Sequence, residues 1–545
     1  MSYSDYVQAA KIGKKDYQSK LMAGESPTLE VLDDILHTTK SYREVSLGLV
    51  QIPLAQVVGT KTAGRSNSFS SNFMPILDPN SEFASKWMTL STAQQEEGIT
   101  DPIIAYEYMN KFYVLEGNKR VSVLKYYDAV SVMGQVTRIL PKKTDDYDVK
   151  LYYEFVDFYS LSEINYLYFS KLGSFEKLQT VVGKKPGEVW SHNERIDFRS
   201  LFLTFQSKYD EIGGENLKEI TCGDAFLAFT QLYGYKELLE MSDSELTKLI
   251  NSNFSEFELM SDTEVDLRMT ASTKKASVLT KLLTPGAKHL KVAFIYEKTS
   301  ASSAWTYSHE LGRLHLNEVF PDDVTTVYYD SINSHNIEEA IDDAIANGCN
   351  VIFTTSPTFS QASLKAAIAN PKITILNCSL HDPHTSMRTY YARMHEAKFI
   401  MGAVAGSMAA HDKIVYIADY PIYGTIANIN SFAQGVKMTN PRAKIHLLWS
   451  CLKDVDVEEQ IKQLQPDCVS DKDLSVPEAG TRYYGLYMSY PDSIWNLAIP
   501  IYNWGKFYEQ LIEAILNGTW KADDSKNVKA INYWWGMAEN AIEVI

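Results

Sequence analysis

Residues Gly117, Asn118, Lys119 and Arg120 have the types and spacing of a phosphate-binding turn. They follow two short apolar segments, 102–106 and 112–115, and they precede an amphipathic stretch. A glycine where a strand passes into a helix lets backbone N–H groups converge on an anion, and adjacent cations add charge. Cations at a helix N-terminus oppose the helix dipole, which favours a functional role over a solvated basic helix start. We therefore predict that these four residues bind an anion or a nucleotide.

A second group of candidate residues follows strand ends in the C-terminal half. From residue 290 on, short apolar segments alternate with amphipathic ones, which predicts parallel strands joined by right-handed helical crossovers. Ligands of open parallel sheets bind beyond the carboxyl ends of the strands. Trp305 is the ring best placed to stack on a ligand, with packing inside a lobe as the alternative. The predicted ligand-binding residues are Trp305, Thr355, Phe359, Asp419 and Tyr423.

Metal and catalytic motifs do not emerge from the sequence. His381 and His384 stand in the sequence HDPH without a full set of further His and Cys ligands beside them, so a hydrogen-bonded loop pair is favoured over a metal site. There is no Walker loop, nucleophile elbow, HExxH motif or paired-Cys motif. We therefore expect a binding protein, not an enzyme, with neither a cofactor nor a metal. The cysteines are far apart and are expected to be buried free thiols: Cys222, Cys349, Cys378, Cys451 and Cys468.

The length of 545 residues requires several domains to position these sites. Two α/β lobes around a cleft are expected at the C-terminus, with a break between them near residue 410. The tryptophans Trp495 and Trp504 stand among apolar neighbours and are expected in the core. Residues 270–286 are predicted to form a helix that ends in a Pro-Gly linker. The predicted domains are a helical segment (1–46), a small α+β domain (47–141), a helical domain (142–286) and a bilobed ligand-binding domain (287–545).

Charge and hydropathy narrow the class of partner. The net charge is −16, and no segment is a basic patch of the kind that holds nucleic acid by counterion release. The first residues lack the apolar core of a signal peptide, and the longest weakly polar run, 399–410, is too short to span a bilayer. We expect a cytoplasmic protein with no membrane segment and with a small molecule as its partner. Whether it forms a homodimer stays open.

The C-terminal region resembles the basic membrane lipoprotein family, the substrate-binding proteins of nucleoside-type ABC importers. The blocks that carry the resemblance are VAFIY, WTYSHELGR (305–313), VIFTTSPTF (351–359), EAKFIMGAVAGSMAAHDKIVYIADYPIYG (396–424), NSFAQGVKMTNPRAKIHLLWS (430–450) and GTW (518–520). The resemblance implies a bilobed, type I periplasmic-binding-protein-like fold and a nucleoside or base as ligand.

Several positions depart from the usual pattern of that family. In place of its aspartate after the first strand stands Glu297-Lys298-Thr299-Ser300, and the stretch GLYMSYPD (485–492) lacks the aspartate that holds a ribose. The family's downstream lysine is also missing from IPIYNWG (499–505). With the missing leader, these departures resemble the cytoplasmic regulatory offshoots of the family.

The small N-terminal domain resembles the ParB/sulfiredoxin fold. The match covers about residues 47–140, with IPLAQV as its first strand, Pro102-Ile103 before a core strand, and GNKRVSVLK (117–125). The resemblance implies that the glycine-and-cation segment grips the phosphates of a nucleotide, with CTP the known case. Asn118 stands in the neighbourhood where sulfiredoxins place a catalytic cysteine, so reductase chemistry is not expected.

These observations together predict a cytoplasmic sensor of a nucleoside-like ligand. An exported substrate-binding component of an importer is the first alternative. A ParB-like CTP-binding protein or CTPase that associates with DNA is the second.

Overall fold

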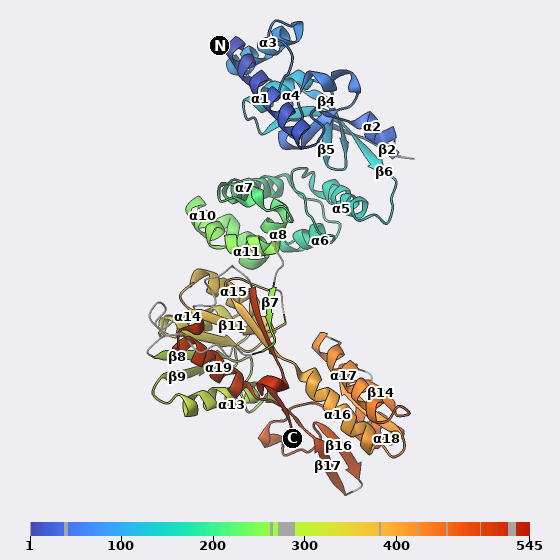
Figure 1. The fold of residues 1–545 in the computed structure, drawn as a ribbon, viewed down its shortest axis with the longest axis vertical. Helices are drawn as coiled ribbons and strands as arrows, with labels where there is room; N and C mark the ends of the chain where they lie inside the picture. The colour runs from blue at the N-terminus through green and yellow to red at the C-terminus, as the bar shows by residue number, and fades with distance from the viewer. Residues whose placement is uncertain are drawn as a thin grey trace. The chain divides into compact units, whose positions relative to one another are not determined.

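The computed structural model describes residues 2–37, 42–261, 265–270, 289–380, 383–421, 423–453, 456–490, 492–520 and 530–545 (Figure 1). Contacts divide the chain into two compact units. The N-terminal unit is Met1–Asp210 with Ile220–Met241, and the C-terminal unit is Glu211–Glu219 with Ser242–Ile545. The predicted α/β class is confirmed, since the sheets of the C-terminal unit are largely parallel and alternate with helices. The predicted helix over 270–286 lies almost wholly outside the described residues.

The N-terminal unit contains a mixed sheet whose described strands run in the order β1-β3-β5-β4-β6-β2. Met109 and Asn110, both with positive φ, form the tight turn between β4 and β5. The strand, turn, strand and helix expected over residues 102–125 are therefore confirmed. The strands are β1 (Glu30–Val31), β2 (Tyr42–Pro53), β3 (Val57–Thr60), β4 (Ile103–Tyr108), β5 (Lys111–Glu116) and β6 (Ser131–Pro141), and the helices are α1 (Ser2–Met22), α2 (Leu32–His37), α3 (Glu82–Glu96) and α4 (Asn118–Tyr126).

A helical part follows the sheet within the same unit. Glu107 of β4 is fully buried, forms an ion pair with Arg138 of β6, and accepts a hydrogen bond from the Tyr152 hydroxyl at 2.9 Å. A buried charge is stable only when it is paired and hydrogen-bonded, so this cluster fixes α5 to the sheet. The helices are α5 (Tyr147–Ser162), α6 (Ser174–Val181), α7 (His192–Glu211), α8 (Cys222–Tyr233) and α9 (Tyr235–Glu240).

The first lobe of the C-terminal unit is a parallel sheet in the order β7-β19-β12-β11-β10-β8-β9. Helices α13 and α19 pack closely, because a Cβ on Gly312 of α13 would lie 2.8 Å from the Tyr508 ring of α19. Trp504, at the start of α19, is buried as predicted. The strands are β7 (Val265–Arg268), β8 (Leu290–Ile295), β9 (Val324–Tyr329), β10 (Val351–Thr354), β11 (Thr374–Cys378), β12 (Arg388–Ala392) and β19 (Ala530–Trp535), and the helices are α13 (Ala304–Val319), α14 (Ile337–Ala346), α15 (Ser360–Ala369) and α19 (Trp504–Leu516).

The second lobe has a smaller sheet in the order β14-β13-β15-β16-β17. Its last two strands are antiparallel, which the alternation of strands and helices did not predict. Trp495 lies on the edge strand β17 and is 60% exposed, so its assignment to the core was wrong. The strands are β13 (Lys413–Ala418), β14 (Lys444–Trp449), β15 (Cys468–Ser470), β16 (Leu486–Tyr490) and β17 (Ser493–Ala498), and the helices are α16 (Met394–Met408), α17 (Tyr423–Thr439) and α18 (Val457–Leu464).

The lobes separate at residues 392–394, not near residue 410. The reason is that α16 belongs to the second lobe, where it packs on α17. A Cβ on Gly402 would lie 2.1 Å from the Phe432 carbonyl oxygen, so this close approach depends on glycine. Among the described residues the chain passes between the lobes after β12, after β17 and after β19. The short strands β18 (Pro500–Tyr502) and β20 (Ile542–Val544) pair with each other in these connections.

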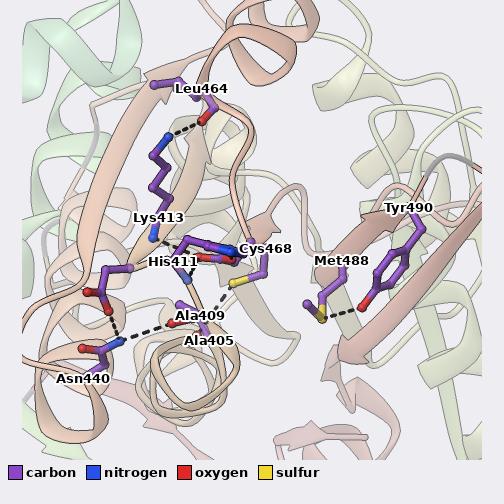
Figure 2. Close-up of polar contacts among 11 residues, drawn as sticks. Ala405, Ala409, His411, Lys413, Asn440, Leu464, Cys468, Met488 and Tyr490 are labelled. Atoms are coloured by element: carbon purple, nitrogen blue, oxygen red, sulfur yellow. Dashed lines mark hydrogen bonds and ion pairs between the residues drawn. The ribbon is translucent and has the colours of Figure 1, made fainter.

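A polar cluster closes the edge of the second lobe where β13 and β15 begin. Asp467 accepts hydrogen bonds from the backbone N–H groups of His411 and Lys413, and its other carboxylate oxygen lies 2.7 Å from His411 Nδ1. Figure 2 shows this cluster, with Lys413 Nζ donating to the Leu464 carbonyl at 3.3 Å. These contacts fix the edge opposite to the one where ligands of parallel sheets bind.

No described helix is both long and apolar enough to cross a membrane.

Candidate ligand-binding site

Trp305 is the centre of an aromatic cluster at the carboxyl ends of the first-lobe strands. It stands in the first turn of α13, and its indole N–H donates to the Thr355 carbonyl at 2.8 Å. This bond joins the start of α13 to the loop that follows β10. The indole ring contacts the rings of Tyr502 at 5.3 Å, Trp504 at 5.7 Å and Tyr391 at 6.3 Å between centroids. The cluster therefore includes a residue of the hinge, Tyr502.

A small cavity between the two lobes shares Tyr391 and Tyr502 with this cluster. The space open to the centre of a water molecule is about 20 Å³, which is room for about one water. A ligand larger than water can therefore enter only if the lobes move apart. The cavity is lined by Leu380, Tyr391, Ala392 and Trp534 of the first lobe, by Met394 and His395 at the start of α16, by Gly424, Ala427 and Asn428 of α17, and by Tyr502.

The titratable groups that line the cavity are uncharged near neutral pH. Burial, with smaller effects of Cys378 and Asp473, raises the pKa of Tyr391 to about 12. Burial and the neighbouring Tyr391 raise the pKa of Tyr502 well above its usual value. The pKa of His395 is lowered, chiefly by burial. Neutral phenols, an imidazole and the Asn428 amide can donate and accept hydrogen bonds, so the lining suits a neutral ligand with polar edges.

A buried ion pair lies close to the two tyrosines. Lys398 of α16 is only 2% exposed and pairs with Asp473, which follows β15. The Lys398 ammonium also lies 5.2 Å from the centre of the Tyr416 ring. The Asp473 carboxylate contributes to the raised pKa of both Tyr391 and Tyr502. The two charges neutralise each other and leave the cavity lining uncharged.

The other residues predicted to bind the ligand differ in how far they are exposed to solvent. Thr355 is buried, and its hydroxyl donates to the Ile295 carbonyl at 3.0 Å. Phe359 is fully buried. Asp419, at the end of β13, is exposed and accepts a hydrogen bond from Ser450. Tyr423 begins α17, and its side chain lies outside the described part of the structure.

The structure joins Trp305 and Thr355 by a hydrogen bond, but neither of them lines the cavity, and Phe359 and Asp419 do not line it either. A role for any of these residues in ligand binding stays a prediction. The strand-end rule missed Tyr391, Tyr502, Asn428 and Trp534, which line the cavity. The missed signal is the Tyr-Tyr pair that ends β12, because an aromatic residue at a strand end beside a lobe crossing is a candidate for a cleft.

The predicted anion site in the N-terminal unit has a different character. Arg120 donates to the carbonyls of Pro102 at 2.6 Å and Asp101 at 3.4 Å, so its guanidinium already forms hydrogen bonds with the backbone. Lys119 lies 4.7 Å from the centre of the Phe83 ring. Asn118 is 8% exposed, and its buried Oδ1 has no hydrogen-bond partner in the described structure.

Gly117 is explained by packing. Its φ is +107°, and a Cβ there would lie 2.6 Å from Cγ2 of Ile103. Both the backbone conformation and the close side chain exclude other residues without any need for a ligand.

His384 of the HDPH sequence contacts one carboxylate and does not belong to a group of three metal-binding side chains among the described residues. His384 contacts the carboxylate of Glu256 at 3.2 Å, and His381 lies outside the described residues. Among the residues that the structure covers, no three His, Cys, Asp or Glu side chains are grouped so as to hold a metal ion.

The C-terminal region is similar to known binding proteins of ABC transporters. Residues 289–461 match the family of ABC transporter substrate-binding proteins described as PnrA-like. A purine-binding protein of Brucella abortus is 26% identical over 279 residues, which are 48% of this chain and 77% of that protein. A Haloferax volcanii protein described as an ABC transporter glucose-binding protein is 22% identical over 46% of this chain and 64% of its own length.

Among solved structures, an ABC transporter solute-binding protein from Conexibacter woesei is 14% identical, with a TM-score of 0.37 over 47% of this chain and 88% of that one. The residues that match the family, 289–461, extend from β8 through α16 and α17 into α18. They include cavity-lining residues of both lobes but not Tyr502 and Trp534. The C-terminal region of this chain is therefore related to the substrate-binding proteins of ABC transporters.

Proposed function

We propose that the C-terminal unit binds a purine-like small molecule between its two lobes and that the chain acts as a ligand sensor without catalytic activity. The observation that carries the proposal is the cavity, which is lined by rings from both lobes and by the Asn428 amide and has no charged side chain in its lining. A purine base is neutral, flat and rimmed by donors and acceptors, so it suits such a lining. The purine-binding relative supports this ligand class.

The small size of the cavity makes hinge motion part of the proposal. Closure of the lobes around a base would replace the present contacts of Tyr391 and Tyr502 by stacking on the ligand. Its energy would come from contacts made only in the closed, liganded state.

Thermal unfolding of the purified chain with adenine, guanine, hypoxanthine, adenosine, guanosine and D-glucose tests the proposal. We expect a rise of the melting temperature of the C-terminal unit with at least one base or nucleoside and none with glucose. Tyr502→Leu should reduce that affinity by roughly tenfold or more, since loss of a stacked ring removes about 1–3 kcal/mol. Tyr490→Leu, at the exposed end of β16, is the matched control. A rise with glucose alone, or with none of these compounds, would refute a purine ligand.

The cytoplasmic location is part of the same proposal. All five cysteines are free, which suits a reducing compartment. Fractionation of the native source should find the protein in the cytosol. Recovery from the cell envelope or the medium would instead support an exported component of an importer.

A second candidate function is nucleotide binding by the N-terminal unit. Burial and the neighbouring cations Arg65 and Lys86 lower the pKa of Lys119, and the Glu82 carboxylate, which pairs with Lys86, opposes this shift. Three positive charges and one negative charge therefore gather near the start of α4. Such a cluster favours an anionic ligand. Since Arg120 holds backbone carbonyls, Lys119 and Arg65 are better placed than Arg120 to contact phosphates.

Titration calorimetry with CTP, ATP and inorganic phosphate tests this second function. Lys119→Met with Arg65→Met should abolish binding, whereas Lys11→Met on α1 should leave it unchanged. Phosphate release from CTP would extend the function to a CTPase, and a gel shift at moderate salt would test DNA association. If none of the three anions gives a binding heat, nucleotide binding by the N-terminal unit is refuted.

A further inference from the structure

Glu256 of α11 (Phe254–Ser261) is a buried carboxylate held by a loop of the first lobe. One of its oxygens accepts hydrogen bonds from the backbone N–H groups of Thr385 at 3.1 Å and Ser386 at 2.8 Å. The hydroxyls of the same two residues donate to that oxygen at 2.6 and 2.7 Å. The other oxygen lies 3.2 Å from His384 Nδ1. Glu256 is 9% exposed, so these contacts replace its hydration.

This loop connects the neighbourhood of Glu256 with the cavity. It leaves β11 after Cys378 and enters β12 at Arg388, and the two strands are parallel neighbours in the sheet. A connection between parallel neighbours must return from the edge where strands end to the edge where they begin. Leu380, near the first edge, lines the cavity, and Thr385 and Ser386, near the second edge, hold Glu256.

The strand that follows α11 is held at the hinge. β7 pairs with β19, and the carbonyl of Met269, directly after β7, accepts a hydrogen bond from the Arg393 guanidinium at 3.2 Å. Arg393 is 7% exposed and lies between β12 and α16, where the chain first passes between the lobes. The same guanidinium donates to the Trp534 carbonyl at 2.8 Å. A rotation of the lobes about this crossing therefore acts on the end of β7.

We propose that α11 and β7 together form the output element of the receptor, docked through Glu256 to the cavity loop and through Met269 to the hinge. An element held at both places changes its docking when the hinge moves, and its docking in turn biases the hinge. The link from ligand to output rests on the proposed function. The docking and its effect on the hinge do not, because both can be measured without any ligand.

Hydrogen–deuterium exchange of the full, ligand-free chain tests the proposal. In Glu256→Gln, an amide replaces the carboxylate with little change of shape, and its one acceptor oxygen carries no negative charge, so the hydrogen bonds from the four donors become weaker. We expect about tenfold faster exchange at residues 383–386 and in α11, and a smaller increase at residues 391–396 of the hinge. Glu258→Gln, an exposed position on the same helix, is the matched control and should change none of these segments.

Arg393→Lys tests the other attachment. It removes the forked guanidinium contacts and should speed exchange in β7 and, through it, in α11. Circular dichroism confirms that each variant remains folded. Faster exchange confined to α11 and residues 383–386, with the hinge unchanged in both variants, would reduce Glu256 to a local anchor and overturn the proposal. Exchange in Glu256→Gln equal to that in Glu258→Gln would overturn it as well.

Purine and glucose additions separate this inference from the function proposed above. If no compound binds but Glu256→Gln still loosens the hinge, the output element stands and the ligand class fails. If a purine binds and the hinge is insensitive to Glu256, the function stands and the output element fails.

Discussion

Each of the two units holds a lysine away from solvent, Lys125 half-buried and Lys398 fully buried, and the two lysines are held in opposite ways. Lys125 of α4 donates to the Val57 carbonyl at 2.8 Å and lies 5.0 Å from the centre of the Phe73 ring. Burial lowers its pKa to about 8. Lys398 of α16 pairs with Asp473. Burial lowers the pKa of Lys398, but the charge of Asp473, aided by Tyr416, outweighs burial and leaves the pKa above its usual value.

The difference shows that burial alone does not decide what a charged side chain contributes. A carbonyl and a ring compensate an ammonium only in part, whereas a carboxylate does so fully and also extends its influence to neighbouring groups. In the C-terminal unit, that influence reaches the tyrosines of the cavity. In the N-terminal unit, the Lys125 ammonium contacts only the Val57 carbonyl and the Phe73 ring among the contacts described above.

The largest effect is expected when Lys398 loses its carboxylate. Asp473→Asn leaves a buried ammonium unpaired and should lower the unfolding free energy of the C-terminal unit by about 3–5 kcal/mol. The pKa of Lys398 should then fall below its usual value, as that of Lys125 does. Urea unfolding followed by tryptophan fluorescence measures the loss. The exposed Asp492→Asn serves as control, and an equal loss in both variants would contradict the role of the ion pair.

The helix that carries Lys125 supplies the next prediction. Gly117→Ala at the start of α4 should cost the N-terminal unit about 2–4 kcal/mol, since the new Cβ meets Ile103 and adopts a positive φ. Gly98→Ala, which also has a positive φ but no atom within 4 Å, should cost only about 1 kcal/mol. Thermal unfolding compares the two variants. Similar losses would mean that the packing against Ile103 is unimportant.

The pH dependence of stability should reveal the unpaired lysine. The pKa of Lys125 falls from 10.5 to about 8 on folding, which corresponds to at most about 3–4 kcal/mol. Between these pH values the unfolded chain binds the extra proton, so the unfolding free energy contributed by this group rises with pH. Below pH 8 the full penalty applies.

Lys125→Met should therefore remove a rise in stability between about pH 8 and pH 10.5. Unfolding of the N-terminal unit in urea at both ends of this range measures the rise, with the exposed Lys11→Met as control. A rise that persists unchanged in Lys125→Met must come from other groups.

The smallest effect on stability is expected at Lys119, a cation that is neither deeply buried nor paired with a carboxylate. Lys119→Ala removes a contact with the Phe83 ring and relieves repulsion from Arg65 and Lys86. These changes oppose each other, and the net change of stability should stay below about 1 kcal/mol. Differential scanning calorimetry at two salt concentrations measures it. A loss above 2 kcal/mol would make Lys119 a structural residue and weaken the nucleotide proposal.

Much of the fold followed from local pattern. The turn at Met109 and Asn110, the helix after Gly117 and the alternation from residue 290 on are encoded within a few residues of each position. The break near residue 410 was wrong because it depended on the contact of α16 with α17, which brings Gly402 against Phe432. The exposure of Trp495 was missed for a similar reason. Apolar neighbours in sequence do not reveal that β17 is a sheet edge.

The sequence by itself determined which residues can do chemistry and which segments are strands and helices, because backbone propensity and hydrophobic period are local. Only the tertiary structure decided which of those residues meet. Tyr391, Asn428 and Tyr502 line one cavity although they come from a strand end, a helix of the other lobe and a hinge strand. Arg120 was the most obvious cation of its turn, yet its nearest acceptors are backbone carbonyls. Contacts between distant segments depend on how the whole lobe packs, and no short-range pattern encodes them.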